Sequence, residues 1–301
     1  MELYNKKNIL FAKMPKNRRN TFYAFMLILP TAFFILVFRF YPILYSIYYS
    51  FFDYNLMFPD LASFIGFSNY KFAFLTDPDF YGSIFVTVIY AVLKIVFQLI
   101  PGFLLALLLR IRFKLTGALR TAVLTPTVTS MVVVSVIWSL LLNPHSGLFN
   151  SVLSIFGIAP QPFLTSSNQA LLSLLAMTLW KDMGFVVIVF LSGLMEIPQT
   201  LYEQASIDGA NSFAKTIRIT VPLMKRTFLF LATMMTVWSF KVFTPIYLTT
   251  EGGPSRATNV LVYYIYENAF TYMDMGYALA LTVILLVIAS MFSAIHFKVF
   301  R

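Results

Sequence analysis

Apolar and polar residues alternate along the chain in long blocks, with six apolar stretches separated by shorter polar segments. A helix needs about 20 mostly apolar residues to cross a bilayer, because every backbone amide in lipid must be hydrogen-bonded within its own helix. All six stretches reach that length. The pattern therefore predicts six membrane-spanning helices, at residues 21–47, 83–109, 117–142, 170–194, 227–248 and 272–299.

Two of the polar segments carry a pattern of their own. Residues 48–82 contain Asn, Asp, Pro and Gly turn signals, which predict a short ordered segment that is too small for a separate domain. Residues 147–156 are weakly amphipathic and predict a helix that lies along the outer membrane interface. No internal repeat is visible in the sequence.

The composition excludes a soluble protein. Of the 301 residues, 59% are hydrophobic and 11% are charged, whereas a soluble domain carries about 25% charged residues. Too few polar residues remain to cover a water-exposed surface. We therefore expect an all-α integral membrane protein that is embedded in lipid.

The formal net charge of +10 is distributed unevenly among the polar segments. Cations gather in the N-terminal tail (residues 1–21), in the second and fourth connections and at the C-terminus, as Lys6, Lys7, Lys13, Lys16, Arg18, Arg19, Arg110, Arg112, Lys114, Arg120, Lys215, Arg218, Lys225, Arg226, Lys298 and Arg301. The other three connections contain Lys71 and Arg256 against the carboxylates Asp53, Asp60, Asp77, Asp79, Glu251, Glu267 and Asp274. Because cations favour the cytoplasmic side, both termini are predicted to be cytoplasmic, with an even number of spans. A nucleic-acid partner is not expected, since no soluble region could carry a basic binding surface.

Several kinds of chemistry are excluded by residue type. The chain has no Cys, which excludes disulfides, thiol catalysis and Cys-based metal sites. His145 and His296 fall on opposite sides of the predicted membrane and cannot form a metal pair within one subunit. No cleavable signal peptide is expected, because the first apolar stretch is too long and lacks a small-residue cleavage site. No G-x-x-x-x-G-K-[ST] loop is present, so any nucleotide binding must come from another chain.

The predicted inner segment 196–223 is unusually long for a plain connector. Pro198 can open a helix over residues 199–207, because its fixed φ suits a first helical turn. The dipeptide Asp208-Gly209 that follows is a turn signal.

A second short helix is expected after this turn, capped by Asn211 or Ser212. It should stop near Thr220, because the residue before Pro222 is biased away from the helical conformation. Two short helices with a sharp bend at Gly209 would fit a groove on a partner protein. The alternative is a solvated connector between spans.

The inner segment resembles the EAA loop of ABC importer permeases, whose pattern is approximately E-A-A-x-x-x-G-x(9)-I-x-L-P. The matching positions are Glu203, Gln204, Ala205, Gly209, Ile219, Val221 and Pro222. Gln204 replaces the second-position Ala, Val221 replaces Leu, and Thr216 stands where a Phe is frequent. The spacing is intact. With Tyr202 ahead and Asp208 and Ala210 around the glycine, this version is similar to the carbohydrate branch, which includes maltose-type and glycerol-3-phosphate-type permeases.

Further short matches to this branch occur in the expected order. They are Tyr41-Pro42-Ile43, Ser50-Phe51, Gly66, Asn69-Tyr70, Asn143-Pro144, Gly147-Leu148, Asn150, Gly184-Phe185, Leu191, Gly193-Leu194, Thr250, Gly252-Gly253-Pro254 and Thr258. Each is weak alone, but together they extend the resemblance over roughly residues 41–299.

The resemblance implies a type I ABC importer permease fold, with a transmembrane domain at residues 22–301, a core at 82–299 and a coupling loop at 196–223. Such a chain is a transport subunit of a bacterial cell membrane and not an enzyme. It forms half of a pore for a sugar, oligosaccharide or polyol. The implied partners are a second permease subunit, expected here to be a paralogue in a heterodimer, two ATPase subunits that bind ATP and Mg²⁺, and an extracytoplasmic solute-binding protein. The implied coupling residues are Glu203, Ala205, Asp208 and Gly209.

Charged residues inside the predicted spans are candidates for the substrate pathway, because a charge in lipid is costly. Lys181 and Asp182 lie near the middle of the fourth span beside Trp180, and Lys241 lies inside the fifth span beside Trp238. Trp180, Lys181, Trp238 and Lys241 offer aromatic faces and hydrogen-bonding groups to a sugar. The alternative is an ion pair that only fixes helix packing, for example Lys241 with Asp182. Two further cations, Arg39 and Lys94, are less informative, and Arg39 can snorkel to the interface.

Three other functions are weighed against that of a carbohydrate importer permease. A stand-alone secondary transporter usually needs intramembrane carboxylates and often shows inverted repeats, but only Asp182 is a candidate here. An intramembrane enzyme lacks catalytic pairs in this sequence. An ABC importer for a different polar solute stays open.

Overall fold

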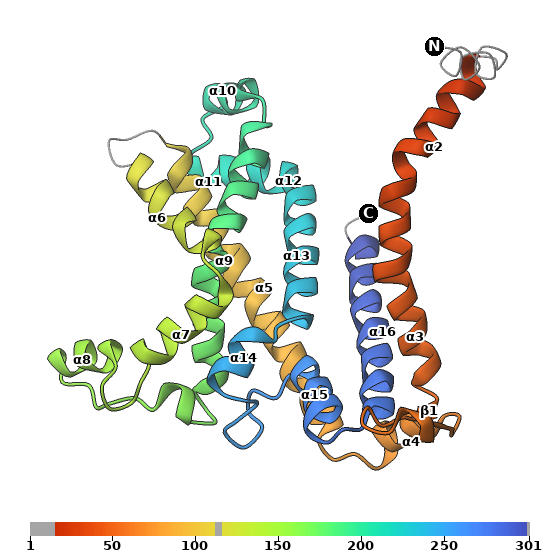
Figure 1. The fold of residues 1–301 in the computed structure, drawn as a ribbon. Coiled ribbons are helices and arrows are strands. Elements are labelled where there is room, and N and C mark those ends of the chain that lie inside the picture. Colours follow the sequence, from red (N-terminus) through yellow and green to blue (C-terminus); the bar gives the residue numbers. More distant parts are fainter. Residues whose placement is uncertain (1–15, 112–115, 300–301) are drawn as a thin grey trace, which may run out of the picture.

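The computed structural model describes residues 16–111 and 116–299 of the chain. The molecule is built from helices that run between two ends, which we name the α10 end and the α4 end after the elements that lie there (Figure 1). Most of the predicted tail, the loop cations Arg112 and Lys114, and Arg301 lie outside the described residues.

Four of the predicted spans are confirmed as long apolar helices. The first consists of α2 (Lys16–Ile35), a π-helical turn η1 (Leu36–Phe40) and α3 (Tyr41–Tyr49) in one continuous column. The others are α5 (Phe80–Arg110), α9 (Ala170–Met195) and α16 (Met275–Val299). Within the described residues, these are the four helices that are long and apolar enough to cross a membrane by themselves.

The predicted continuous helix over residues 117–142 is wrong. The structure has two helices there, α6 (Thr116–Val128) and α7 (Met131–Leu141), bent by 104°. The break falls in a run of Thr, Pro and Ser, which are poor helix formers. Ser130 takes an extended conformation with ψ 138°, and the Thr129 amide turns back to donate to the Pro126 carbonyl at 3.2 Å.

The predicted helix over residues 227–248 is also divided. Helix α13 (Lys225–Phe240) ends before Lys241, and a short helix, α14 (Thr244–Thr249), follows. A proline ring clashes with the carbonyl four residues earlier and has no amide hydrogen to donate. For Pro245 that carbonyl belongs to Lys241, where the helix stops.

Two other prolines are accommodated without a break. The π-helical turns η1 and η4 (Thr216–Thr220) each end two residues before a proline, Pro42 and Pro222. In both cases the carbonyl that the proline ring would hit lies inside the wider turn, which gives it room. The expected helix stop near Thr220 is therefore wrong, because the chain continues through η4 into α12 (Val221–Leu223).

The connections at the α4 end are ordered, as the turn signals predict. Strand β1 (Phe52–Asp53) pairs antiparallel with β2 (Ser63–Phe64), with Phe52 opposite Phe64, and the turn η2 (Pro59–Leu61) lies between them. Helix α4 (Ser68–Leu75) follows, and its Asn69 side chain donates to the Ser50 and Phe52 carbonyls at 3.0 Å each.

Further short elements also lie at the α4 end (Figure 1). Helix α8 (Leu148–Ile155) confirms the helix predicted over residues 147–156, and a short turn, η3 (Phe163–Thr165), leads from it toward α9. Helix α15 (Leu261–Tyr266) and the π-helical turn η5 (Glu267–Thr271) lead into α16.

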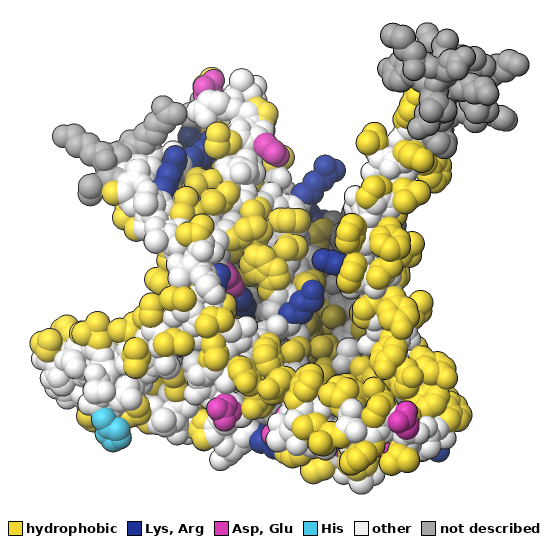
Figure 2. All heavy atoms as spheres, in the orientation of Figure 1, with side chains coloured by type: hydrophobic (Ala, Val, Ile, Leu, Met, Phe, Trp, Pro, Cys, Tyr) yellow, Lys and Arg dark blue, Asp and Glu magenta, His cyan; other side chains and the backbone are white. Residues whose placement is uncertain are grey.

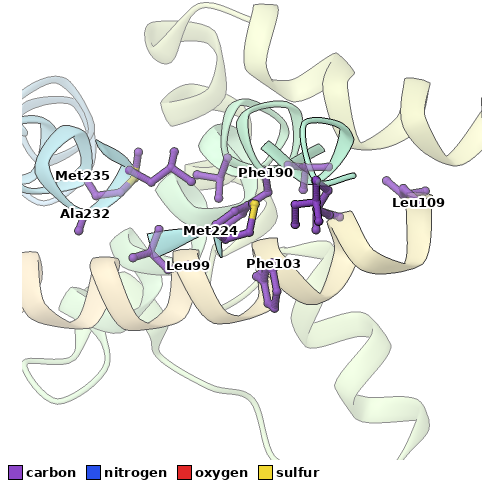
Figure 3. Close-up of a cluster of buried hydrophobic side chains, with 13 residues drawn as sticks. Leu99, Phe103, Leu109, Phe190, Met224, Ala232 and Met235 are labelled. Carbon is purple, nitrogen blue, oxygen red and sulfur yellow. The ribbon is translucent and has the colours of Figure 1, made fainter. Parts of the chain in front are cut away.

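The main core forms where α5 packs along α9 and α13. Figure 3 shows Phe103, Phe190, Met224 and other buried side chains from these elements meeting in one cluster. The Phe103 and Phe190 rings meet edge to face, with centroids 5.4 Å apart. Burial of such rings stabilises the contact by roughly 1.5–3 kcal/mol per side chain.

The column made by α2, η1 and α3 stands apart from this core and packs against α16 through α3 (Figure 1). None of its membrane-length window is buried inside the chain. Leu27 is 80% exposed, and its neighbours are similarly open. These apolar side chains are suited to lipid or to another membrane subunit.

Close packing of α9 on α6 depends on the absence of a side chain at Gly184. A Cβ there would lie 2.6 Å from the Val123 carbonyl oxygen and 3.0 Å from the Leu124 Cα. We expect Gly184→Ala to lower the free energy of unfolding in detergent by about 1–3 kcal/mol through overpacking.

Gly82→Ala is the matched control, because a Cβ at that helical position meets nothing within 4 Å. Its stability should stay equal or rise slightly, since Ala favours helix over Gly by about 1 kcal/mol. Equal melting temperatures for the two variants would contradict the close contact between α9 and α6.

Candidate functional site

A row of polar side chains follows one face of α5 through the apolar interior. Its members are Ser83, Thr87, Tyr90, Lys94 and Gln98, all of them buried. Spacings of three and four residues place side chains on one face of a helix. This row is the polar seam between α5 and its neighbours α9 and α15.

Each part of the seam has partners on another element or on its own helix. The Leu261 amide of α15 donates to Thr87 Oγ1 at 2.8 Å. The Tyr90 hydroxyl lies 2.7 Å from Thr178 Oγ1 of α9. Gln98 Nε2 donates to the Leu179 carbonyl at 3.2 Å, while its buried Oε1 has no partner among the described residues.

An ion pair lies at the centre of the seam. Lys94 Nζ is 2.8 Å from Asp182 Oδ2, and the Lys94 side chain is only 4% exposed. Lys181 Nζ is 3.8 Å from the other oxygen of the same carboxylate and donates to the Thr127 carbonyl at 3.5 Å. The two cations share one carboxylate, and the pair predicted between Lys241 and Asp182 is not formed.

A cavity of about 310 Å³ opens beside this ion pair, at the level of the middle of α5 and α9. Its lining residues are Lys94, Met131, Thr178, Lys181, Asp182, Trp238, Lys241, Val242, Phe243, Thr244 and Pro245. Lysine and arginine side chains are visible in the hollow at mid-height of the molecule (Figure 2). The break caused by Pro245 places Lys241 at the cavity wall.

Three of the four pathway residues predicted from the sequence meet in this cavity: Lys181, Trp238 and Lys241. Trp180 does not line it and instead packs near Trp138 of α7, with ring centroids 5.9 Å apart. The sequence reasoning missed the part that Lys94 plays. The three- and four-residue spacing of polar groups around Lys94 was the signal that could have found it.

The inner segment 196–223 forms the predicted bent pair of short helices at the α10 end (Figure 1). Helix α10 (Gln199–Ile207) has the predicted bounds, and α11 (Ser212–Lys215) follows the turn. Gly209 has φ +77°, a conformation that a side chain makes costly. Asn211 is the cap of α11, and its Oδ1 accepts the Ala214 amide at 2.8 Å.

The bent pair is tied to the membrane helices through Tyr202. The Arg110 guanidinium, at the end of α5, lies 4.8 Å from the centre of the Tyr202 ring. The Tyr202 hydroxyl is 3.0 Å from Thr220 Oγ1 in η4. Across the bend, Lys215 Nζ donates to Ser206 Oγ at 2.7 Å. These contacts hold the two short helices in a fixed orientation.

The predicted coupling residues Glu203, Asp208 and Gly209 are exposed, and Ala205 is half-buried. Two large apolar side chains flank the bend, Ile207 with 86% and Phe213 with 75% of its surface exposed. The sequence reasoning did not select them as binding residues. Apolar residues on both sides of a polar turn were the available signal.

A second polar network joins the connections at the α4 end. The Asp77 carboxylate accepts hydrogen bonds from the hydroxyls of Tyr264, at 2.8 Å, and of Tyr277. Arg256 pairs with Asp79 and Glu267 at 3.0 Å each. Burial by itself would lower the pKa of Arg256, but the hydrogen bond and charge of Glu267, together with the charge of Asp79, outweigh it, so the pKa is raised.

This network fastens the start of α5 to α15 and α16. Among the described residues, no group of three or more His, Cys, Asp or Glu side chains is arranged to hold a metal ion.

The family model for the binding-protein-dependent transport system inner membrane component matches residues 72–299. The chain belongs to this family of multi-pass permease subunits of ABC transporters, which are not enzymes and work with a separate ATPase subunit.

Individual relatives are similar over nearly their whole length. The chain is 32% identical to the probable ABC transporter permease protein YurN of Bacillus subtilis, over 94% of this chain and 97% of the relative. It is 30% identical to the sulfoquinovosyl glycerol transport system permease protein SmoG of Agrobacterium fabrum, over 92% and 90%. A bacterial alginate ABC transporter, solved with an alginate pentasaccharide-bound periplasmic protein, superimposes with a TM-score of 0.81 at 26% identity, over 93% and 94%.

The Lys94–Asp182 ion pair is expected to stabilise the folded protein. Asp182→Asn leaves the buried Lys94 without a charged partner, and removing one member of a buried pair costs about 3–5 kcal/mol. We expect a lower melting temperature in detergent and a lower yield from membranes. The double variant Lys94→Gln with Asp182→Asn should regain most of the loss. Losses that simply add in the double variant would mean that the two side chains are not coupled.

Proposed function

We propose that the chain forms half of the pore of an ATP-driven, binding-protein-dependent importer for a carbohydrate, and that residues 196–223 couple it to a cytoplasmic ATPase subunit. The observation that carries this proposal is the bent helix pair at the α10 end. It is exposed, held in place by Tyr202, and presents Ile207 and Phe213 without partners among the described residues. Such a shape fits docking into a groove of another protein.

Each coupling residue has a physical role in this docking. Glu203 supplies an exposed carboxylate that can pair with a basic residue of the ATPase. Ala205 is half-buried, and its carbonyl accepts the Ala210 amide across the bend at 2.8 Å. Asp208 and Gly209 form the turn itself.

The remaining partners follow from the same arrangement. ATP and Mg²⁺ would be bound by two ATPase subunits, since this chain has no P-loop. A second permease subunit, most simply a paralogue, would cover the open column of α2 and α3 and complete the cavity. A solute-binding protein would dock at the α4 end, in keeping with the periplasmic protein in the alginate complex.

A carbohydrate is the best-supported substrate class. Two of the similar chains named above belong to transporters for sulfoquinovosyl glycerol and for alginate. The cavity offers the aromatic rings of Trp238 and Phe243 next to polar groups, a combination suited to a sugar ring. The proposed pathway residues are Lys181, Trp238 and Lys241 in its wall, together with Trp180, which precedes Lys181 on α9 and packs near Trp138.

We further propose six spans with both termini in the cytoplasm. The two broken segments, α6 with α7 and α13 with α14, each count as one span in this topology. The start of α2 and the end of α16 point toward the α10 end, in line with this orientation (Figure 1).

Because the chain has no Cys, single cysteines can report the topology directly. We expect a membrane-impermeant maleimide to label Ser212→Cys only after the cells are lysed. The same reagent should label Ser255→Cys in unlysed cells whose outer envelope has been permeabilised. Labelling of both positions from the same side would contradict six spans.

Glu203→Lys tests the coupling role. We expect the variant to insert into the membrane normally but to lose transport about tenfold or more, because repulsion replaces an attractive contact with the ATPase. ATP hydrolysis by the complex should no longer respond to the loaded binding protein.

Thr200→Lys is the control, since it introduces a lysine on α10 farther from the bend, at an exposed position, without removing a carboxylate. It should transport at a rate close to the unmodified protein. Unchanged transport in Glu203→Lys would show that the loop does not couple the chain to the ATPase.

A further inference from the structure

The cavity contains more positive than negative charge. Its wall carries three lysines, Lys94, Lys181 and Lys241, and a single carboxylate, Asp182. Lys94 forms the close ion pair with that carboxylate, at 2.8 Å, and Lys181 reaches it at 3.8 Å. The Asp182 carboxylate is therefore shared by Lys94 and Lys181, and it does not pair with Lys241.

Lys241 has no hydrogen-bond or ion-pair partner for its ammonium group within residues 16–111 and 116–299. Its backbone is fixed, because its amide donates to the Trp238 carbonyl at 3.2 Å and Pro245 ends the helix there. The side chain is exposed into the space beside the cavity. An unpaired cation at this depth is costly unless water or an anion reaches it.

The same wall presents aromatic surface next to these ammonium groups. Trp238 is half-buried and packs on Phe185, with centroids 5.0 Å apart. Phe243 stacks on Tyr247 at 5.2 Å with an angle of 17° between the rings. Tyr266 lies 5.1 Å from Phe243 and extends this aromatic surface away from the cavity.

We propose that the substrate is an anionic carbohydrate, a sugar that carries a phosphate, carboxylate or sulfonate group, and that Lys241 binds this group during passage. The proposal rests on the function proposed above and names its substrate class. Rings of lysine or arginine select anions in membrane pores, and a cavity lined by one sign of charge concentrates ions of the opposite sign. A neutral sugar would leave the excess charge of the cavity uncompensated.

Lys94 and Lys181 have a different part in this scheme. Both are held by Asp182, so their charges are fixed near the seam between α5 and α9. Lys241 is the cation that is free to move toward a ligand. Substitution of Lys241 should therefore affect anion binding without disturbing the helix packing that Asp182 supports.

The test uses the complete complex with its ATPase and second permease subunits, in detergent and without the binding protein, whose own selectivity would obscure the result. Thermal stability is measured with glucose 6-phosphate, glucuronate and glucose as probes, at matched ionic strength. We expect the two anionic probes to raise the melting temperature and glucose to leave it unchanged.

Three variants assign the effect to Lys241. Lys241→Gln should raise the concentration of anionic probe needed for half-maximal protection about tenfold or more, as for one lost charge-assisted hydrogen bond. Lys241→Arg should keep the protection. Lys71→Gln, which makes the same chemical change at an exposed position on α4, should behave like the unmodified complex.

Several outcomes would overturn the proposal. Protection by glucose equal to that by glucose 6-phosphate would show that the charge is not recognised, and protection by none of the probes would show the same. Full protection in Lys241→Gln would exclude this lysine. Failure of the Lys241→Gln complex to assemble would mean that the lysine pairs with a carboxylate of a neighbouring subunit.

These results are separable from the proposed function. If ATP hydrolysis of the complex still responds to its loaded binding protein while anionic probes give no protection, only the substrate class is wrong. If the chain fails to assemble with an ATPase, or hydrolysis never responds to a binding protein, the importer function itself is wrong.

Discussion

A lysine in the middle of a membrane protein must be paired or hydrated, and this requirement organises the structure. Lys94 is buried at the centre of α5 and is compensated by Asp182 of α9. The contact fixes the register of the two longest interior helices, with Tyr90 and Gln98 making further polar contacts on either side of it. Around this seam the packing is apolar and close, down to the missing side chain of Gly184. The cavity opens next to the ion pair, so the most constrained part of the interior adjoins the part that has room for a solute.

Pro245 and Pro222 lie where membrane helices stop being regular, whereas Pro30 and Pro101 stand inside α2 and α5. Pro245 ends α13 at Lys241, which turns a residue of a helix into a residue of a cavity wall. Pro222 instead is absorbed by the wide turn η4, so the chain stays helical between the bent pair and α13. The difference lies in the turn ahead of each proline, because i→i+5 pairing makes room for the ring, whereas the regular α-helix ahead of Pro245 ends where the ring would clash.

Much of this arrangement could be predicted from the sequence, and the exceptions have physical causes. Long apolar blocks predicted four helices correctly, because backbone amides in lipid must be hydrogen-bonded within a helix. Local signals predicted α10, the turn at Gly209 and the Asn211 cap, since capping and turn preferences act over a few residues. Hydropathy could not show the 104° bend between α6 and α7, because a broken span is as apolar as a straight one. The partner of Asp182 was missed for a different reason: the choice among Lys94, Lys181 and Lys241 depends on how three helices pack.

The seam also determines how motion would be transmitted through the molecule. The start of α5 is anchored, because Thr87 accepts the Leu261 amide and Asp77 accepts two tyrosine hydroxyls. Its other end carries Arg110, which contacts the bent helix pair through Tyr202. At 1.5 Å per residue, Lys94 lies about 21 Å and Arg110 about 45 Å from Phe80. A rigid α5 that pivots at its anchored end therefore moves the bent pair roughly twice as far as the cavity wall. A displacement of the bent pair would therefore reach the cavity wall reduced by about half.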